Sequence, residues 1–274
     1  MKTILVPTDF SKAAENALNT AKIIARKTNA TIHIANFYSI PVVDYAYPDV
    51  SMSAEILEQT RKAAILGTEQ VVAHLKDYGY SVASTVDIGL VSEEITALAS
   101  KIEADMIVMG TTGANGIVNK IMGSNAAHVM QKTTCPILLI PEKSNIDNIK
   151  NVIYLAQLEE DDIEILTKLF TLGEDLGFDN IKIVNVSTGF FFKEINEDLI
   201  DLMKKTFGSY KIKFANVEGA DMKEGVDKYL EEHKTDLVVM STHKKTFLER
   251  IFAKSNTQEM ALYSNMPLLV YHKE

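Results

Sequence analysis

An internal repeat is the feature that most constrains the fold of this 274-residue chain. Residues 104–141 align without a gap on residues 235–272. The alignment pairs Asp105 with Asp236, Met109 with Met240, Ser124 with Ser255, Asn125 with Asn256 and Pro136 with Pro267. Two unrelated domains that share only a general pattern would not keep one register over such a length. The chain is therefore interpreted as two tandem copies of one unit.

Each copy alternates short aliphatic runs with longer segments of helical periodicity, a pattern typical of a parallel sheet covered by helices on both faces. In the first copy, strands are expected at 3–6, 31–37, 80–86, 106–109 and 137–140. In the second copy, they are expected at 152–156, 181–186, 210–217, 237–240 and 268–271. The sequence thus predicts an α/β fold built twice.

Helices are expected between these strands, the first of them opened by Ser11 as a good N-cap residue. The others are expected at 53–78, 92–103, from near Ser124, and at 159–176, 194–207, 222–233 and 255–264. Residues 143–149 are polar and lack periodicity, so they are interpreted as a linker. We therefore expect domains at 1–142 and 150–274, each of ordinary domain size.

Composition excludes several classes of protein. The formal net charge is −9 and no basic stripe occurs, which argues against nucleic acid or an anionic membrane as partner. No apolar run approaches the length of a membrane span, and the one cysteine, Cys135, has no disulfide partner in the chain, so a cytoplasmic protein is expected. The six histidines are scattered, so no metal ligands are expected, and no catalytic residue is assigned.

A glycine-rich loop in the first copy is the main candidate for chemistry. It contains Gly110, Gly113, Gly116 and Gly123, and Ser124 follows at the start of a predicted helix. Glycines let a backbone aim several N–H groups at an anion, and a helix N-terminus attracts phosphate. A tight loop that binds nothing is the alternative interpretation.

The spacing of these glycines fits neither the dinucleotide fingerprint nor the P-loop. It fits G-x2-G-x9-G-[ST], the ATP-binding signature of universal stress proteins, with Gly110, Gly113, Gly123 and Ser124 at the fixed positions. The opening KTILVPTD and the closing TTCPILLIP of the first copy resemble that family as well. The chain as a whole resembles a tandem universal stress protein.

The resemblance implies a fold and an assembly. Each domain would be doubly wound and Rossmann-like, of the adenine nucleotide alpha hydrolase type, with a five-stranded parallel sheet of order 3-2-1-4-5 between helices. The last strands of the two copies would meet to form an intramolecular pseudo-dimer, and a further homodimer is plausible. Asp9 and the glycine loop would then converge where the strand order reverses, the usual ligand position in such sheets.

The resemblance also implies a ligand, ATP or else ADP or AMP, together with Mg²⁺. The residues expected to bind it are Pro7, Thr8, Asp9, Asn36, Gly110, Thr112, Gly113, Ala114, Gly116, Gly123, Ser124 and Asn125. Asp9 would accept hydrogen bonds from the nucleoside, and the backbone at Asn36 would contact adenine. Asp9 has a second interpretation, as an acidic residue that stabilises the start of the following helix.

The second copy lacks this signature. Ser241, Lys244 and Lys254 stand where the first copy has Gly110, Gly113 and Gly123. Pro7, Thr8 and Asp9 are replaced by Leu155, Ala156 and Gln157. The basic residues Lys244, Lys245, Arg250 and Lys254 could attract an anion or form a solvated loop. One nucleotide per chain is therefore expected.

The function expected is that of a stress-response module that binds an adenine nucleotide and acts on an unknown protein partner. A slow ATPase and a nucleotide-free interaction scaffold are the alternatives; the glycine loop has one cation, Lys120, which argues against fast hydrolysis. Two segments stay open in role: residues 38–49 as a lid or a surface loop, and Phe190–Phe192 as an exposed patch or part of the core.

Overall fold

The structure is a computed structural model that describes residues 1–39, 50–111, 122–144, 146–188, 196–242 and 266–273. The loop at 40–49, the Phe190–Phe192 segment and the helix expected at 255–264 lie outside these residues.

The secondary structure follows the repeat. The first half contains β1 (Thr3–Pro7), α1 (Lys12–Thr28), β2 (Thr31–Tyr38), α2 (Val50–Asp77), β3 (Val82–Ile88), α3 (Val91–Lys101), β4 (Met106–Gly110), α4 (Ser124–Lys132) and β5 (Ile137–Ile140). The second half contains β6 (Val152–Leu155), α5 (Asp162–Leu176), β7 (Asn180–Thr188), α6 (Glu197–Thr206), β8 (Lys211–Gly219), α7 (Met222–Glu232), β9 (Leu237–Thr242) and β10 (Leu268–His272). Every expected strand is present, with ends that shift by up to two residues.

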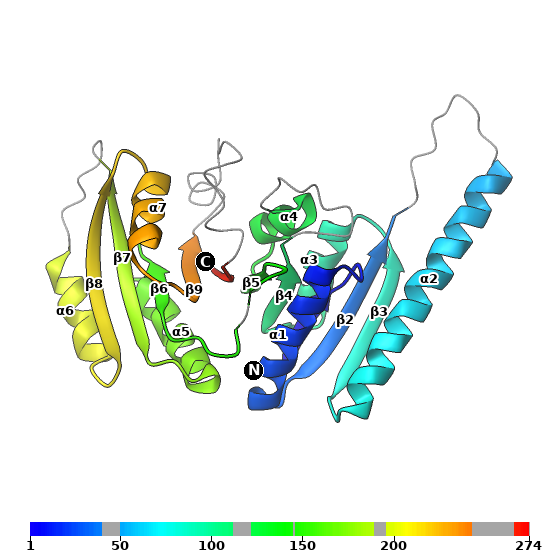
Figure 1. Cartoon of the computed structure of the whole chain (residues 1–274), viewed down its shortest axis with the longest axis horizontal. Helices are drawn as coiled ribbons and strands as arrows, with labels where there is room; N and C mark the ends of the chain where they lie inside the picture. Colours follow the sequence, from blue (N-terminus) through cyan, green and yellow to red (C-terminus); the bar gives the residue numbers. More distant parts are fainter. Residues whose placement is uncertain (40–49, 112–121, 145, 189–195, 243–265, 274) are drawn as a thin grey trace.

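All ten strands form one sheet, of order β3-β2-β1-β4-β5-β10-β9-β6-β7-β8 (Figure 1). Within each half the order is 3-2-1-4-5 and every pairing is parallel, as expected. The halves join through β5 and β10, which pair antiparallel with Leu268 opposite Leu139. The expected contact between the last strands is therefore confirmed.

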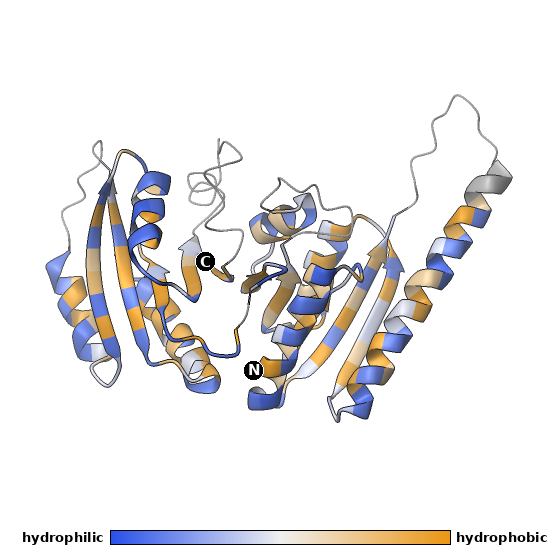
Figure 2. Ribbon diagram, viewed as in Figure 1, coloured by the Kyte–Doolittle hydropathy of each residue, from blue (hydrophilic) through white to orange (hydrophobic). Residues whose placement is uncertain are grey.

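Alternate residues of each central strand face two separate cores, because side chains along a strand point to opposite faces. Ile4 and Val6 of β1 belong to the core that contains buried residues of α1 and α5, whereas Leu5 belongs to the core that contains those of α3, α4 and α7. Figure 2 shows the resulting apolar strands between helices whose outer faces are hydrophilic. Both faces of the sheet are covered, so the strands read as continuous apolar runs in the sequence.

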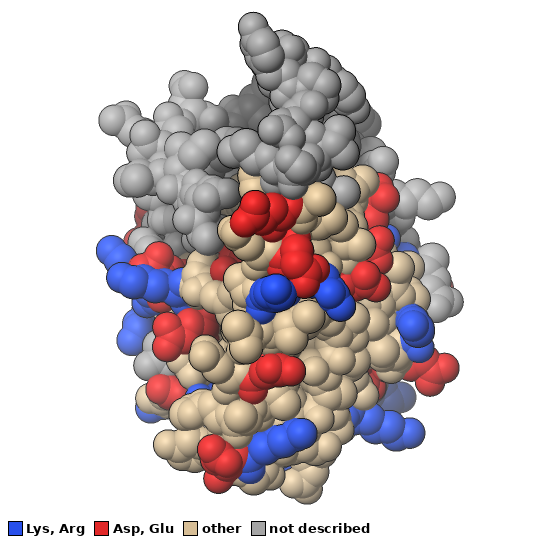
Figure 3. Space-filling model, turned by 90° about the vertical axis from the view of Figure 1, so that its right-hand side faces the viewer, with Lys and Arg blue, Asp and Glu red and all other residues tan. Residues whose placement is uncertain are grey.

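The surface seen in Figure 3 carries basic and acidic side chains interspersed over its described part. No helix among the described residues is long and apolar enough to cross a membrane.

His272 forms a hydrogen bond across the junction between the two halves. Its Nε2 donates a hydrogen bond to the backbone oxygen of Met130 in α4, at 2.8 Å. Its Nδ1 is then unprotonated, and this buried atom has no hydrogen-bond partner. Burial lowers the pKa of His272 below 6.5, with a smaller opposing effect from the bond to Met130. A proton on Nδ1 would be buried without an acceptor.

The junction is therefore expected to weaken in mild acid. A folded-state pKa below the unfolded value means that the unfolded chain binds more protons, so stability falls as the pH drops below about 6.5. Urea unfolding at pH 7.5 and at pH 5.5 measures this loss. His272→Gln keeps an amide donor but does not titrate, so it should show a smaller loss between these pH values; an equal loss would contradict the role of His272.

Candidate functional site

The end of β1 is tied to β2 by two hydrogen bonds. The Thr8 amide donates to the Ala35 oxygen at 2.8 Å, and the Asn36 side chain donates to the Thr8 oxygen at 2.7 Å. Asn36 is buried, 7% exposed. In the second half Asn185 makes the same bond to Ala156, at 3.0 Å. Because this bond persists where the glycine signature is absent, the Asn36 side chain serves the fold, a role that sequence reasoning missed.

The segment from Thr8 to Ser11 turns the chain from β1 into α1. The Thr8 hydroxyl accepts from the Phe10 amide at 3.1 Å, and the Asp9 carboxylate accepts from the Ser11 amide at 3.0 Å. Ser11 caps α1 by accepting from the Ala14 amide at 3.2 Å, as expected. Asp9 thus supports the start of the helix, as its second interpretation proposed. Its side chain is nevertheless exposed at the end of the sheet where ligands bind in this fold class.

Phe10 holds a left-handed backbone, with φ of 61°. Its ring lies over Gly67 of α2, where an added Cβ would come within 2.7 Å of the ring. Leu158 repeats the conformation in the second half, with φ of 55°. Left-handed backbone is strained for such side chains, so it persists only where the surroundings enforce it. Sequence spacing gave no signal of this turn.

Gly110 is required by packing. It ends β4, and an added Cβ would lie 2.7 Å from the backbone carbon of Ala13 and 2.9 Å from the amide nitrogen of Ala14. The start of α1 therefore presses directly on the end of β4. The sequence expectation, a glycine that lets backbone approach a phosphate, identified the position; the structure adds this contact as a physical reason.

The two described ends of the glycine loop lie together. The Gly123 amide donates to the Thr111 oxygen at 2.6 Å. Gly123 is the N-cap of α4 with φ of −64°, so its backbone does not require glycine, and it provides no side-chain cap. Ser124 and Asn125 are exposed in the first turn of α4. A helix start without a side-chain cap presents N–H groups that suit an anion.

Of the residues predicted to bind a nucleotide, those at the end of β1 and those at the end of β4 lie close together. A third group, in the middle of the glycine loop, is not described. β1 pairs in parallel with β4, so Asp9 and Gly110 lie at the same edge of the sheet, where the strand order reverses. Pro7, the last residue of β1, is buried at this edge. Thr112, Gly113, Ala114 and Gly116 lie outside the described residues.

The second half fills the matching position with a buried polar network. Ser241 stands at the position of Gly110. Asp162, the first residue of α5, stands at the position of Ala14 in the first turn of α1. The Tyr154 hydroxyl donates to Asp162 at 2.5 Å and lies 2.9 Å from the Ser241 hydroxyl. The Lys273 ammonium lies 2.8 Å from Asp162. We call these four residues the Asp162 network.

The Asp162 network is enclosed. Asp162 is 0% exposed, and the Lys273 side chain is 1% exposed. Burial and the neighbouring Asp162 charge raise the pKa of Tyr154 well above its ordinary value. The crevice end of the second half is thus occupied by the chain's own side chains. Sequence reasoning found the loss of the glycines and missed the ion pair that replaces them.

His128 and Cys135 are two further side chains capable of acid–base or nucleophilic chemistry. His128 is exposed on α4. The Cys135 thiol is half-buried and donates to the Ala104 oxygen at 3.0 Å; burial, together with the Asp105 charge, raises its pKa to about 12. Among the described residues, no group of three His, Cys, Asp or Glu side chains could hold a metal ion.

Comparison with known proteins identifies the family of the chain. The model of the universal stress protein family matches residues 1–141 and 191–272. The chain belongs to the universal stress protein family.

Individual relatives resemble either one half or the whole chain. A universal stress protein of Methanocaldococcus jannaschii, MJ0531, is 32% identical over 144 residues, which span 51% of this chain and 81% of the relative. A crystal structure of a universal stress protein from Archaeoglobus fulgidus matches 99% of this chain and 98% of its own, with a TM-score of 0.70 and 15% identity, and so shares the fold. A universal stress protein solved in complex with cAMP matches 51% of this chain and 96% of its own, at 22% identity and a TM-score of 0.36.

Proposed function

We propose that the first half binds one adenine nucleotide, ATP or its diphosphate or monophosphate, and that the occupied site changes how the chain meets a protein partner in a cytoplasmic stress response. The observation that best supports this proposal is that the uncapped start of α4 and the exposed Asp9 lie at the same edge of the sheet. In this proposal residues 1–142 form the nucleotide domain and residues 150–274 a degenerate domain.

The described residues offer hydrogen-bond donors for the phosphate end of a nucleotide and an acceptor for its nucleoside end. The first-turn N–H groups of α4 and the hydroxyl of Ser124 supply donors for phosphate oxygens. Asp9 supplies an acceptor for ribose hydroxyls or an amino group. Mg²⁺ is bound mainly by phosphate oxygens and water in many nucleotide sites, so it would arrive with the nucleotide and need at most one or two carboxylates.

Exchange of one glycine tests the proposal. Gly113→Lys places the second copy's residue, Lys244, into the first loop, and we expect ATP to bind at least about tenfold more weakly, a loss of about 1.4 kcal/mol. Isothermal titration with ATP and Mg²⁺ measures the change. Lys244→Gly is the matched control and should leave ATP affinity unchanged.

The same titration reports stoichiometry, which should be one nucleotide per chain. Equal, weak binding by wild type and Gly113→Lys would overturn the nucleotide proposal and favour an empty scaffold. Two sites per chain would overturn the asymmetry between the halves. Phosphate release measured over hours, with Ser124→Ala as comparison, separates a binding module from a slow ATPase.

A further inference from the structure

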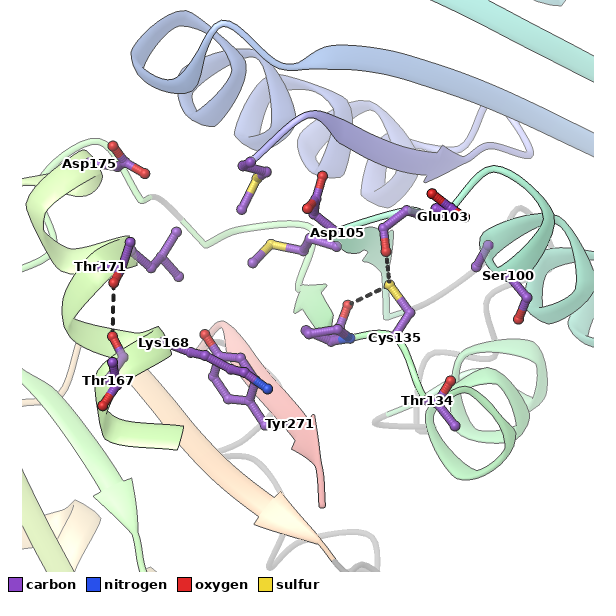
Figure 4. A pocket seen from close by; sticks show the side chains of 16 residues that line it. Ser100, Glu103, Asp105, Thr134, Cys135, Thr167, Lys168, Thr171, Asp175 and Tyr271 are labelled. Atoms are coloured by element: carbon purple, nitrogen blue, oxygen red, sulfur yellow. Dashed lines mark hydrogen bonds between the residues drawn. The ribbon is translucent and has the colours of Figure 1, made fainter. Parts of the chain in front are cut away.

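A cavity of about 710 Å³ lies between the two halves, away from the candidate nucleotide site. Met106, which starts β4, and Pro136, which precedes β5, line it, so it lies at the opposite end of these strands from Gly110. Thr167 to Asp175 of α5 form the facing wall (Figure 4). Its volume is in the range of small-molecule sites, which runs from about 300 to 1,000 Å³.

The cavity has a physical origin in the repeat. On the α1 side of the junction, Asn16 holds the linker through the backbone oxygens of Pro141 and Ser144, at 2.8 and 2.9 Å. Ile146 and Ile149 of the linker are each 4% exposed and belong to the core. No described linker residue lines the cavity, whose wall on the side of the second half is formed by α5.

The entry of each first strand is built in the same way in the two halves. The Asp236 carboxylate accepts the amides of Lys150 and Asn151 at the end of the linker, at 3.1 and 2.8 Å. Its counterpart Asp105 accepts the amides of Lys2 and Thr3, at 2.6 and 2.8 Å. The two halves are thus built alike at this end, and the cavity beside Asp105 follows from what covers each side.

The cavity combines an apolar floor with acidic walls. Met106, Leu172 and Tyr271 are buried residues that reach it. Glu103 and Asp175 stand on opposite walls, and their carboxylates pair with no described residue (Figure 4). The cationic side chain on the wall, Lys168, is engaged with Glu164 at 2.6 Å. Asp105 and the α-ammonium group of Met1 line the cavity too, so three acidic groups face two basic ones, and the surplus of one negative charge favours a cation.

We propose that this cavity binds a small apolar amine, whose body covers the floor and whose ammonium group faces Glu103 and Asp175. The ring of Tyr271 offers a cation–π contact to the same ammonium group. Because the floor is apolar, an amine with an apolar body fits the cavity better than a fully hydrated polyamine does. Binding here is independent of the nucleotide in the first half.

Fluorescence titration with a matched probe pair tests this site. Dansylcadaverine has an apolar ring system and a primary ammonium; the dansyl derivative of 6-aminohexanoic acid ends in a carboxylate. We expect the amine to bind at least tenfold tighter. The double variant Glu103→Gln, Asp175→Asn should weaken the amine at least tenfold and remove the preference. Glu197→Gln with Asp201→Asn, on α6, makes the same charge change and should alter neither probe.

Filling the cavity provides a test that does not depend on charge. Thr171→Trp and Ser100→Trp start from exposed residues on opposite walls, so at least one should fold, as judged by circular dichroism. Either should weaken the amine at least tenfold and leave ATP titration unchanged. Equal binding of both probes, or amine binding that survives a folded cavity-filling variant, would overturn the proposal.

The methionine methyl groups give a second readout on the wild type. With 13C-methyl methionine, saturating dansylcadaverine should shift the resonance of Met106, which lines the cavity, and leave unchanged that of Met203, a buried residue of α6. A shift of Met203 without Met106 would place the probe elsewhere and overturn the site. Failure of the ATP proposal would show in the ATP titration alone, so the two are separable.

Discussion

Replacing Lys273 by methionine is expected to destabilise the chain by about 3–5 kcal/mol, because removal of one partner leaves a buried charge without compensation. Lys273 lies 2.8 Å from Asp162, and both side chains are almost fully enclosed. Lys273 also lies 3.3 Å from Glu159. Equilibrium urea unfolding at pH 7 measures the change.

A surface pair offers a matched control for this prediction. Lys211 pairs with Asp179 at 2.9 Å, but these side chains are 71% and 63% exposed. Lys211→Met should therefore cost less than about 1 kcal/mol. Adding Asp162→Leu to Lys273→Met should recover much of the loss, because it removes the uncompensated carboxylate. A Lys273→Met protein as stable as Lys211→Met would show that Asp162 does not depend on this ion pair.

Replacing Gly110 by alanine is expected to destabilise the first half by about 1–3 kcal/mol through overpacking. The added methyl group would meet the backbone of Ala13 at 2.7 Å, and backbone yields less readily than a side chain. Because α1 must move, Asp9 at its entry should shift as well. We expect ATP affinity to fall about tenfold, which corresponds to about 1.4 kcal/mol.

Gly208 supplies a milder comparison, since an added Cβ there would lie 3.3 Å from the backbone oxygen of Lys204, which needs a shift of only a few tenths of an ångström. Gly208→Ala should destabilise the chain less than Gly110→Ala and leave ATP binding unchanged. Urea unfolding and ATP titration of both variants measure the difference. Wild-type stability in Gly110→Ala would mean that α1 and β4 are not held as closely as the structure has them.

Features that repeat along the chain could be predicted from the sequence. Aliphatic runs placed all ten strands because both faces of the sheet are buried, and the resemblance to universal stress proteins implied the strand order of each half. The Ser11 cap and the start of α4 at Ser124 were found from local residue preferences that the structure confirms.

Features that depend on contacts between distant residues could not be predicted. The packing role of Gly110 depends on how closely α1 approaches β4, which no local spacing reports. Nothing in the local sequence around Asp162 indicates that its carboxylate pairs with Lys273, far along the chain. The amine cavity arises where two halves meet, so no single motif encodes it.

The antiparallel pairing of β5 with β10 has a genetic as well as a physical consequence. A covalent tether makes this pairing intramolecular, so its occupancy does not fall on dilution as that of a two-chain assembly would. Two identical subunits from one gene must change together. Here each half has its own codons, so Gly110 could stay in one half while Ser241 and Asp162 arose in the other.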